Sequence, residues 1–197
     1  MATLPDNKSR IFFDTETTGL HPGNICQLSY IKTAGDDLIT GNLYFMVDYI
    51  EPGAQKVHGL TLDTLRELSG DRRFYDRFGE IKSAFESADV LIAHNINFDL
   101  GFMDAEFKRC NSNFEYHDSM CTMRHFTNIC KIPNYNSNGY KWPKLEEMIR
   151  FFGISQNQII TATQELFNNC NSGFHDARFD VTATYLCFKE AEKLGLL

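Results

Sequence analysis

The stretch FFDTETTGL, residues 12–20, decides how the rest of the sequence is interpreted. It continues a short apolar run of β-prone residues, 10–13, which predicts one buried strand. Asp14 and Glu16 end that strand, and because residues i and i+2 share a face, their carboxylates project together. Buried carboxylates repel each other, and a hard divalent cation such as Mg²⁺ would relieve that repulsion. The alternative is a strand end capped by a polar turn. The D-x-E pattern alone does not distinguish this alternative from a metal site.

Length and composition predict one globular domain covering residues 1–197. Apolar residues make up 43% of the chain and aromatic residues 13%, which is enough to build a core. The net charge of −7 argues against a surface that is basic on all sides, and no extended basic stripe is present in the linear sequence. A phosphate substrate bridged by metal ions remains compatible with this charge, because bound cations reverse the local field.

The cysteines and the N-terminus indicate where the protein works. The six cysteines show neither a C-x-x-C pair nor zinc-ligand spacing, so we expect them to fill the core as reduced thiols. No signal-peptide pattern opens the chain, and no apolar run approaches the length of a membrane span. We therefore expect a soluble, cytoplasmic protein with no membrane partner.

Hydrophobic periodicity predicts strands first and alternating helices later, which indicates an α/β fold with a mixed sheet. The first three strands are expected to form an antiparallel meander, and the run at 90–93 to be a strand buried on both faces. Asn97 is expected to be an N-cap, and residues 130–141 to form a loop, ordered or mobile. The predicted strands are 10–13, 25–32, 43–47 and 90–93, and the predicted helices are 61–68, 74–85, the helix after Asn97, 120–129, 143–152 and 177–194.

Two further polar clusters lie at the ends of predicted elements. HNINFD, residues 94–99, places Asp99 in the first turn of a helix, where the dipole favours an anion; an ordinary capping acid is the alternative. HDARFD, residues 175–180, places His175 in a turn and Asp180 on the first face of the last helix. A lone histidine is more often structural or exposed, but one beside carboxylates could act as a general base near neutral pH.

Together and in this order, the three motifs resemble the signature of the DEDD-type 3′→5′ exonucleases. FDTETTGL resembles the first motif, HNINFD the second (H-N-x-x-F-D) and HDARFD the third (H-x-x-x-x-D), with His175 typical of the histidine subclass, DEDDh. The segments VHGLT (57–61) and WPKL (142–145) are similar to stretches of the same group. The resemblance covers about residues 9–190 and is nearest to the proofreading epsilon subunit of bacterial DNA polymerase III and its stand-alone relatives.

The resemblance implies a ribonuclease-H-like fold, with a central five-stranded mixed sheet flanked by helices. It also implies two divalent ions, Mg²⁺ or Mn²⁺, that promote phosphodiester hydrolysis. Asp14 would bridge both ions, and Glu16 and Asp180 would complete the site beside the attacking water. Asp99 would serve the second ion, largely through water, and His175 would accept the proton of the attacking water.

The resemblance further implies a binding site for the 3′-terminal nucleotide directly after the first two acids. Backbone amides of Thr17, Thr18 and Gly19 would meet that nucleotide, since Gly19 permits close approach of the backbone. Leu20 would wedge against the terminal base, although a place in the core is equally compatible with its apolar character.

Three more residues are candidates for substrate binding. We expect His58 and Asn95 to hold substrate or to order the second motif. Phe98 or Phe102 could stack on a base, but their spacing fits core packing better.

The sequence thus predicts a metal-dependent 3′→5′ exonuclease that acts on single-stranded DNA and releases nucleoside 5′-monophosphates. An exoribonuclease that trims RNA or short oligoribonucleotides is the first alternative, since nothing in the sequence tests the 2′-hydroxyl. An inactive nucleic-acid-binding module and a hydrolase of free nucleotides are the others. A proofreading subunit would need a DNA polymerase partner; the sequence ends soon after the third motif without a long tail, which favours a stand-alone nuclease.

Overall fold

The computed structural model describes residues 8–135, 138–168 and 173–197. Part of the loop expected at 130–141, residues 136 and 137, lies outside this range, as does Cys170. The elements in chain order are β1 (Arg10–Thr17), β2 (Ile25–Ala34), β3 (Asp37–Tyr44), α1 (Pro52–His58), α2 (Leu62–Ser69), η1 (Phe74–Arg77), α3 (Phe78–Glu86), β4 (Val90–Ala93), α4 (Ile96–Arg109), β5 (Ser119–Cys121), α5 (Thr122–His125), α6 (Thr127–Cys130), α7 (Leu145–Phe151), α8 (Gln156–Leu166) and α9 (Ala177–Lys193).

The five strands form one mixed sheet in the order β3-β2-β1-β4-β5. β1, β2 and β3 pair antiparallel, as expected, while β4 pairs parallel to both β1 and β5. The pairing of β1 with β4 ends at Phe12 and Ile92, so β1 continues beyond the end of its neighbour. This overhang carries the first two acids of the sequence motif.

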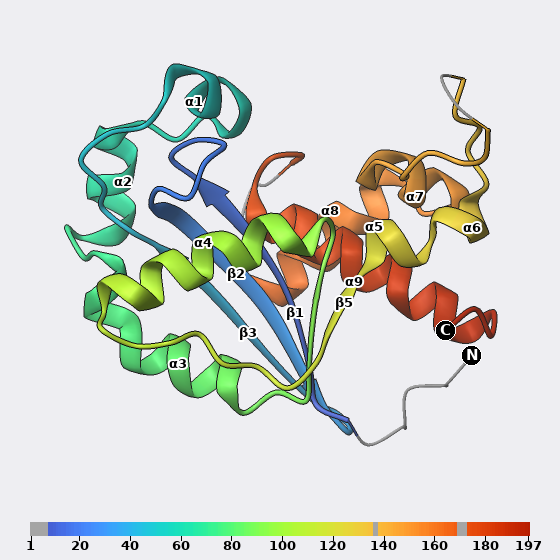
Figure 1. Ribbon diagram of the computed structural model, residues 1–197, viewed down its shortest axis with the longest axis horizontal. Coiled ribbons are helices and arrows are strands. Elements are labelled where there is room, and N and C mark those ends of the chain that lie inside the picture. Colours follow the sequence, from blue (N-terminus) through green and yellow to red (C-terminus); the bar gives the residue numbers. More distant parts are fainter. Residues whose placement is uncertain (1–7, 136–137, 169–172) are drawn as a thin grey trace.

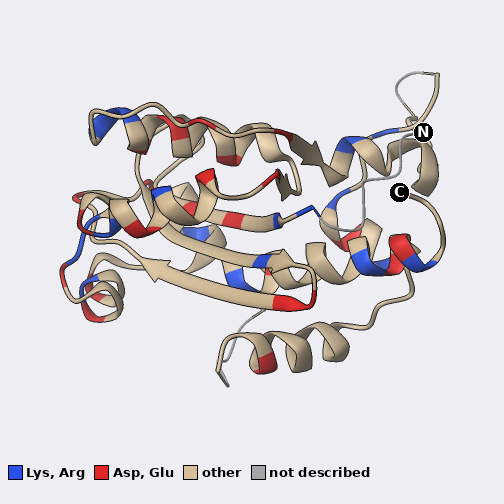
Figure 2. Ribbon diagram, turned by 90° about the horizontal axis from the view of Figure 1, so that it is seen from below, with Lys and Arg blue, Asp and Glu red and all other residues tan. Residues whose placement is uncertain are grey.

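Helices cover both faces of the sheet (Figures 1 and 2). α3 and α4 lie on one face, and α8 and α9 on the other; α1 and α2 flank one side of the fold and α5, α6 and α7 the opposite side. Among the described residues, no helix combines the length and apolar character needed to cross a bilayer.

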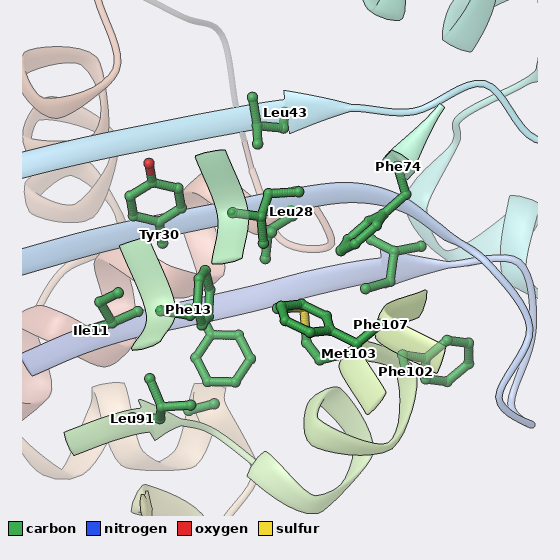
Figure 3. Packing of buried hydrophobic residues seen from close by; sticks show 14 of the residues in the cluster. Ile11, Phe13, Leu28, Tyr30, Leu43, Phe74, Leu91, Phe102, Met103 and Phe107 are labelled. Carbon is green, nitrogen blue, oxygen red and sulfur yellow. The ribbon is translucent and has the colours of Figure 1, made fainter. Parts of the chain in front are cut away.

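Side-chain alternation along β1 attaches the two helical layers to the same strand. Ile11 and Phe13 enter the larger core cluster, where Phe13 packs edge-on against Phe85 of α3 with ring centroids 5.3 Å apart (Figure 3). Phe12 points to the other face, where it packs edge-on against Tyr185 and Phe188 of α9. The strand therefore fixes α9, and with it the third motif, relative to the first motif.

One predicted strand and one predicted helix differ most from the structure. The third strand spans Asp37–Tyr44 instead of 43–47, because Gly35, with φ of +59°, forms a tight hairpin turn and pairing resumes at once between Ala34 and Asp37. Residues 37–42 lie on the sheet's edge and are partly exposed, so their sequence carries no strong alternation. The helix predicted at 120–129 begins instead as the short strand β5, which pairs with β4, and continues as α5 and α6.

Three other details of the fold were not expected. The N-cap of α4 is Asn95, not Asn97, because Asn95 adopts a left-handed conformation with φ of +67° and the helix begins at Ile96. α1 and α8 were not predicted, although Ser155 forms a capping box with Gln158 at the start of α8. Of the described cysteines, Cys26 and Cys187 are fully buried as free thiols, as expected, and the others are partly buried.

We predict that Phe12→Ala lowers the free energy of unfolding by about 3–5 kcal/mol, because it removes a buried ring from the β1–α9 contact. Chemical denaturation measures this loss. Tyr75→Ala, which removes an aromatic ring that is 65% exposed, is the matched control and should change stability by less than about 0.5 kcal/mol. Equal losses in the two variants would contradict the role of Phe12.

Candidate active site

Three carboxylates from distant parts of the chain meet at the carboxyl end of β1. Asp14 and Glu16 lie on the face of β1 that packs against α9, and Asp180 lies in the first turn of α9. Carboxylate oxygens of the three residues lie within 4.8 Å of one another. The structure thus brings together the first and third motifs, as the sequence predicted.

Asp99 approaches the same cluster from α4, on the other side of β1. Its Oδ1 accepts hydrogen bonds from the Thr15 amide at 3.1 Å and the Thr15 hydroxyl at 2.8 Å. The pairing of β1 with β4 ends at Phe12, so no β4 carbonyl is paired with the Thr15 amide. Asp99 accepts the hydrogen bond from this amide instead. Thr15 thereby fixes the orientation of Asp99, and its second carboxylate oxygen remains available to a cation.

Burial raises the pKa of all four acids, and neighbouring negative charges raise those of Asp14, Glu16 and Asp180 further. Burial, followed by the charge of Asp180, raises the pKa of Glu16 to about 9. Burial raises the pKa of Asp99 to about 7 against the opposing hydrogen bonds from Thr15, and that of Asp180 to about 7. The pKa of Asp14 lies well above its usual value because of burial and the neighbouring charges of Asp99 and Asp180.

The donor set fits one or two hard divalent cations. All candidate ligand atoms are carboxylate oxygens, which Mg²⁺ and Mn²⁺ prefer. Asp180 Oδ1 is buried and has no hydrogen-bond partner among the described residues, which is the condition expected of an atom reserved for a ligand. Asp14, Glu16 and Asp180 could hold one ion directly, and Asp14 with Asp99 could serve a second.

His175 lies in the turn before α9, as the sequence predicted, and its side chain is exposed. Its backbone is left-handed, with φ of +65°, and its amide donates to Asp180 Oδ2 at 3.2 Å. The His175 charge lowers the pKa of His58, whose shift is mainly due to burial, so the two imidazoles lie near each other. The imidazole of His175 is thus free to meet a substrate or water beside the carboxylates.

A fifth acid in this region, Asp176, was not singled out from the sequence. It is the N-cap of α9, and its carboxylate accepts hydrogen bonds from the Arg178 side chain and from Gln27 Nε2. Its charge raises the pKa of Glu16 and Asp180 further. An aspartate directly before a predicted helix is the signal that could have identified it. With Arg178 compensating its charge, Asp176 anchors the start of α9 rather than joining the three-carboxylate cluster.

A pocket of about 380 Å³ opens beside Glu16, between the end of β1 and α1. Leu20 lies on its rim and is 79% exposed, so the core position considered for this residue is wrong. The wall also includes a second carboxylate that the sequence did not single out, Glu51. The residues lining the pocket are Thr15, Glu16, Thr17, Gly19, Leu20, Glu51, Gly53, Ala54, Val57, His58 and Phe98.

The turn after β1 uses its own polar groups internally. The Thr17 hydroxyl donates to the Gly19 carbonyl at 2.9 Å. The Thr18 amide donates to the Asn24 carbonyl at 2.9 Å, so this amide is engaged rather than directed at a nucleotide. A Cβ at Gly19 would collide with the carboxylate of Glu51, so a larger residue there would require the Glu51 side chain to move.

His58, the last residue of α1, lines the pocket. The amide of Leu60 donates to His58 Nδ1 at 3.0 Å, so the ring proton lies on Nε2 and donates to the Thr17 carbonyl at 3.2 Å. This hydrogen bond ties α1 to the end of β1.

The remaining residues predicted to bind substrate occupy different places: one lines the pocket, one lies in the core and one is exposed at the start of α4. Phe98 is partly buried and lines the pocket, while its ring rests on Phe102 at a centroid distance of 4.9 Å. Phe102 is fully buried, so the stacking role considered for it is wrong. Asn95 is exposed and starts α4, with its carbonyl accepting from the Phe98 amide, so its position supports ordering of the second motif.

A mixed five-stranded sheet of this order, with acids from β1, α4 and α9 gathered at one end, defines a protein of the ribonuclease-H-like class. The sequence pattern of the exonuclease family matches residues 11–188. The chain belongs to this family, and the resemblance stated from its three motifs is confirmed.

Curated relatives include bacterial proteins named as DNA polymerase III subunit epsilon and DNA polymerase III PolC-type. The chain is 30% identical over 122 residues to DNA polymerase III subunit epsilon of Pasteurella multocida, covering 57% of this chain and 46% of the relative. It is 31% identical over 198 residues to DNA polymerase III PolC-type of Streptococcus pneumoniae, covering 94% of this chain and 12% of the relative. The chain therefore spans less than half the length of these relatives.

Solved structures of exonuclease I share the fold. One matches with a TM-score of 0.72 at 19% identity, covering 94% of this chain and 41% of the other. E. coli exonuclease I in complex with a dA16 oligonucleotide matches with a TM-score of 0.68 at 20% identity, again covering 94% and 41%. The expected ribonuclease-H-like architecture is therefore confirmed.

We predict that Thr15→Val weakens apparent Mg²⁺ binding by about 10- to 100-fold, because Asp99 loses the hydroxyl that orients it. Titration of the Mg²⁺-induced rise in Tm measures the affinity. Thr15→Ser, which keeps the hydroxyl, is the matched control and should bind Mg²⁺ as the wild type does. Wild-type affinity in the valine variant would show that Thr15 has no positioning role.

We also predict that Mg²⁺ raises Tm more at about pH 8 than at about pH 5. Without metal, the raised pKa values mean that the folded state binds more protons than the unfolded state, so stability falls as pH rises from about 4 through about 7 and on toward 9. A bound cation removes this penalty. Melting curves in EDTA and in Mg²⁺ across this pH range test the sign of the pH dependence. In EDTA, the Tm of Asp180→Asn should fall less with rising pH than the Tm of the wild type. A Mg²⁺ effect that is constant with pH would contradict the prediction.

Proposed function

We propose that the chain is a metal-dependent 3′→5′ exonuclease that acts on single-stranded DNA and releases nucleoside 5′-monophosphates. The observation that carries this proposal is the meeting of Asp14, Glu16 and Asp180 within 4.8 Å, since they come from opposite ends of the sequence. Membership of the exonuclease family supports the reaction class.

Asp14, Glu16, Asp99 and Asp180 would hold two divalent ions, Mg²⁺ or Mn²⁺. Such ions stabilise the negative charge that develops on the entering and leaving oxygens during phosphodiester hydrolysis. The protein contributes the preorganised carboxylates, whose repulsion in the metal-free state favours uptake of cations. Thr15 holds Asp99 in place, and the His175 amide does the same for Asp180.

His175 acts as the general base that accepts the proton of the attacking water. Its exposed imidazole is carried on the turn whose amide bonds Asp180, so it stays next to the carboxylates while its ring remains free. Histidine is the side chain that most often serves as a general base.

The pocket beside Glu16 would hold the 3′-terminal nucleotide. Leu20 on the rim and Phe98 on the wall offer apolar surface to a base, and His58, Thr17 and Gly19 shape the wall next to the acids. An exposed leucine at a pocket rim fits a wedge against a terminal base better than any structural role.

The choice of DNA follows from the named relatives. DNA polymerase III subunit epsilon is a curated relative, and exonuclease I has been solved with DNA oligonucleotides. A DNA polymerase is accordingly the proposed protein partner of a proofreading role. RNA remains the alternative substrate, and the same assay decides between the two.

The experiment compares 3′-labelled and 5′-labelled single strands of one sequence, as DNA and as RNA. A 3′→5′ exonuclease releases the 3′ label at once as a mononucleotide and converts the 5′-labelled strand into a descending ladder. We expect activity in Mg²⁺ or Mn²⁺, none in EDTA, and faster turnover of DNA. Release of the 5′ label first, or an EDTA-resistant reaction, would overturn the proposal.

Two variants test the assigned roles in this assay. Asp14→Asn should abolish turnover, and His175→Ala should lower kcat by about 10²–10⁴-fold while leaving the Mg²⁺-induced rise in Tm largely intact. His117→Ala removes an exposed histidine at the amino-terminal end of β4 and should retain full activity. Equal activity of the His175 and His117 variants would disprove the general-base role.

A further inference from the structure

An exposed tryptophan lies on the side of the fold formed by α5, α6 and α7. Trp142 is the only tryptophan of the sequence, and 57% of its surface is exposed. The guanidinium of Arg124, from α5, lies over the ring with its carbon 5.4 Å from the ring centroid. We call this pair, with the exposed Lys144, the Trp142 platform.

Several lysines and arginines that form no salt bridge within the described residues lie in the same part of the chain. Eleven of the 19 lysines and arginines form salt bridges within the described residues. Of the other eight, four lie between Thr122 and Phe151: Arg124, Lys131, Lys144 and Arg150. Arg124 over the exposed ring of Trp142, with Lys144 two residues further along the chain, offers a local site for a polyanion that carries flat rings.

The platform is built onto the active-site end of the sheet. His94, which follows β4, bonds the Thr122 hydroxyl at 3.1 Å, and the Pro143 backbone lies against the same ring. Glu146, the second residue of α7, is close enough to Asp180 for its charge to raise the Asp180 pKa. The platform and the carboxylates are therefore neighbours, connected through the residues that begin α5 and α7.

The platform and the nucleotide pocket lie on opposite sides of the carboxylates. The pocket is formed with α1, whereas α5 and α7 stand on the other flank of the sheet, with the end of β1 between them (Figure 1). A strand whose 3′ nucleotide occupies the pocket and whose scissile phosphate meets the carboxylates would reach that other flank by continuing in the same direction.

We propose that the Trp142 platform binds the substrate strand on the 5′ side of the bond that is cut. A base stacks on the exposed face of Trp142, and Arg124 and Lys144 contact the adjoining phosphates. Stacking on an aromatic ring tolerates every base, so the platform would favour length over sequence. This inference rests on the proposed function, because it assigns a second binding region to the same substrate.

The lone tryptophan provides a direct binding assay that does not depend on turnover. With Ca²⁺ or EDTA in place of Mg²⁺, binding of a single-stranded oligonucleotide of about ten residues should quench the Trp142 fluorescence, whereas a nucleoside monophosphate should not. Fluorescence anisotropy of a labelled oligonucleotide reports binding independently. Binding by anisotropy without quenching by any oligonucleotide would overturn the proposal.

Kinetics on oligonucleotides of two to about twelve residues test the same region during turnover. KM of the wild type should fall with length until the strand reaches the platform. Trp142→Ala should raise KM for the long substrates by about 5- to 100-fold and leave kcat, and KM for the dinucleotide, unchanged. Trp142→Phe should restore most of the length dependence, and Arg124→Ala should lose part of it.

Two matched controls remove comparable side chains elsewhere. Tyr75→Ala deletes another exposed ring and Arg72→Ala another cation without a salt bridge, and both should keep the wild-type length dependence. Loss of dinucleotide cleavage along with the length effect in Trp142→Ala would indicate a structural role and overturn the proposal. A wild type that cleaves no nucleic acid would instead overturn the proposed function, and the inference with it.

Discussion

The repulsion among four buried carboxylates at the end of β1 is the constraint around which the structure is arranged. Burial raises the pKa of each acid, and neighbouring charge raises those of Asp14, Glu16 and Asp180 further, so the metal-free site opposes folding near neutral pH. The free energy that holds the acids together comes from aromatic packing on the two faces of the same strand. Phe13 packs against α3 on one face and Phe12 against α9 on the other, within two residues of Asp14.

Two left-handed residues make this convergence possible. Asn95, with φ of +67°, starts α4, and His175, with φ of +65°, lies directly before the N-cap of α9. Outside glycine, asparagine adopts this conformation most readily, whereas a histidine there stores strain that sites often use. Each turn directs the first turn of its helix at β1, so Asp99 meets Thr15 and Asp180 meets Glu16. The spacing of the two sequence motifs reflects this geometry.

The sequence predicted the features that local patterns encode. The acids at the end of β1, the buried strand at 90–93 and the last helix each carry a periodic signal, and the structure has all three. Prediction from the sequence failed where pairing with a neighbouring strand decides the conformation. β5 is a strand only because β4 lies beside it, and β3 is an edge strand whose exposed residues show no alternation. The pocket and Asp176 were missed for a related reason, since a cavity and an acid compensated by Arg178 exist only after distant segments have met.

The two flanks of the carboxylates differ in a way that bears on how an acidic protein could hold a nucleic acid. On one flank, α1 forms a wall of the pocket and is tied to the end of β1 by the hydrogen bond of His58 to the Thr17 carbonyl. On the other flank, Trp142 and Arg124 are exposed to solvent. In the proposed function a strand would end in the pocket at the first flank and continue past the second, so the wall formed by α1 would favour reaction at a strand end. With most cations engaged in salt bridges, the bound ions and one aromatic platform would supply the attraction that the surface as a whole lacks.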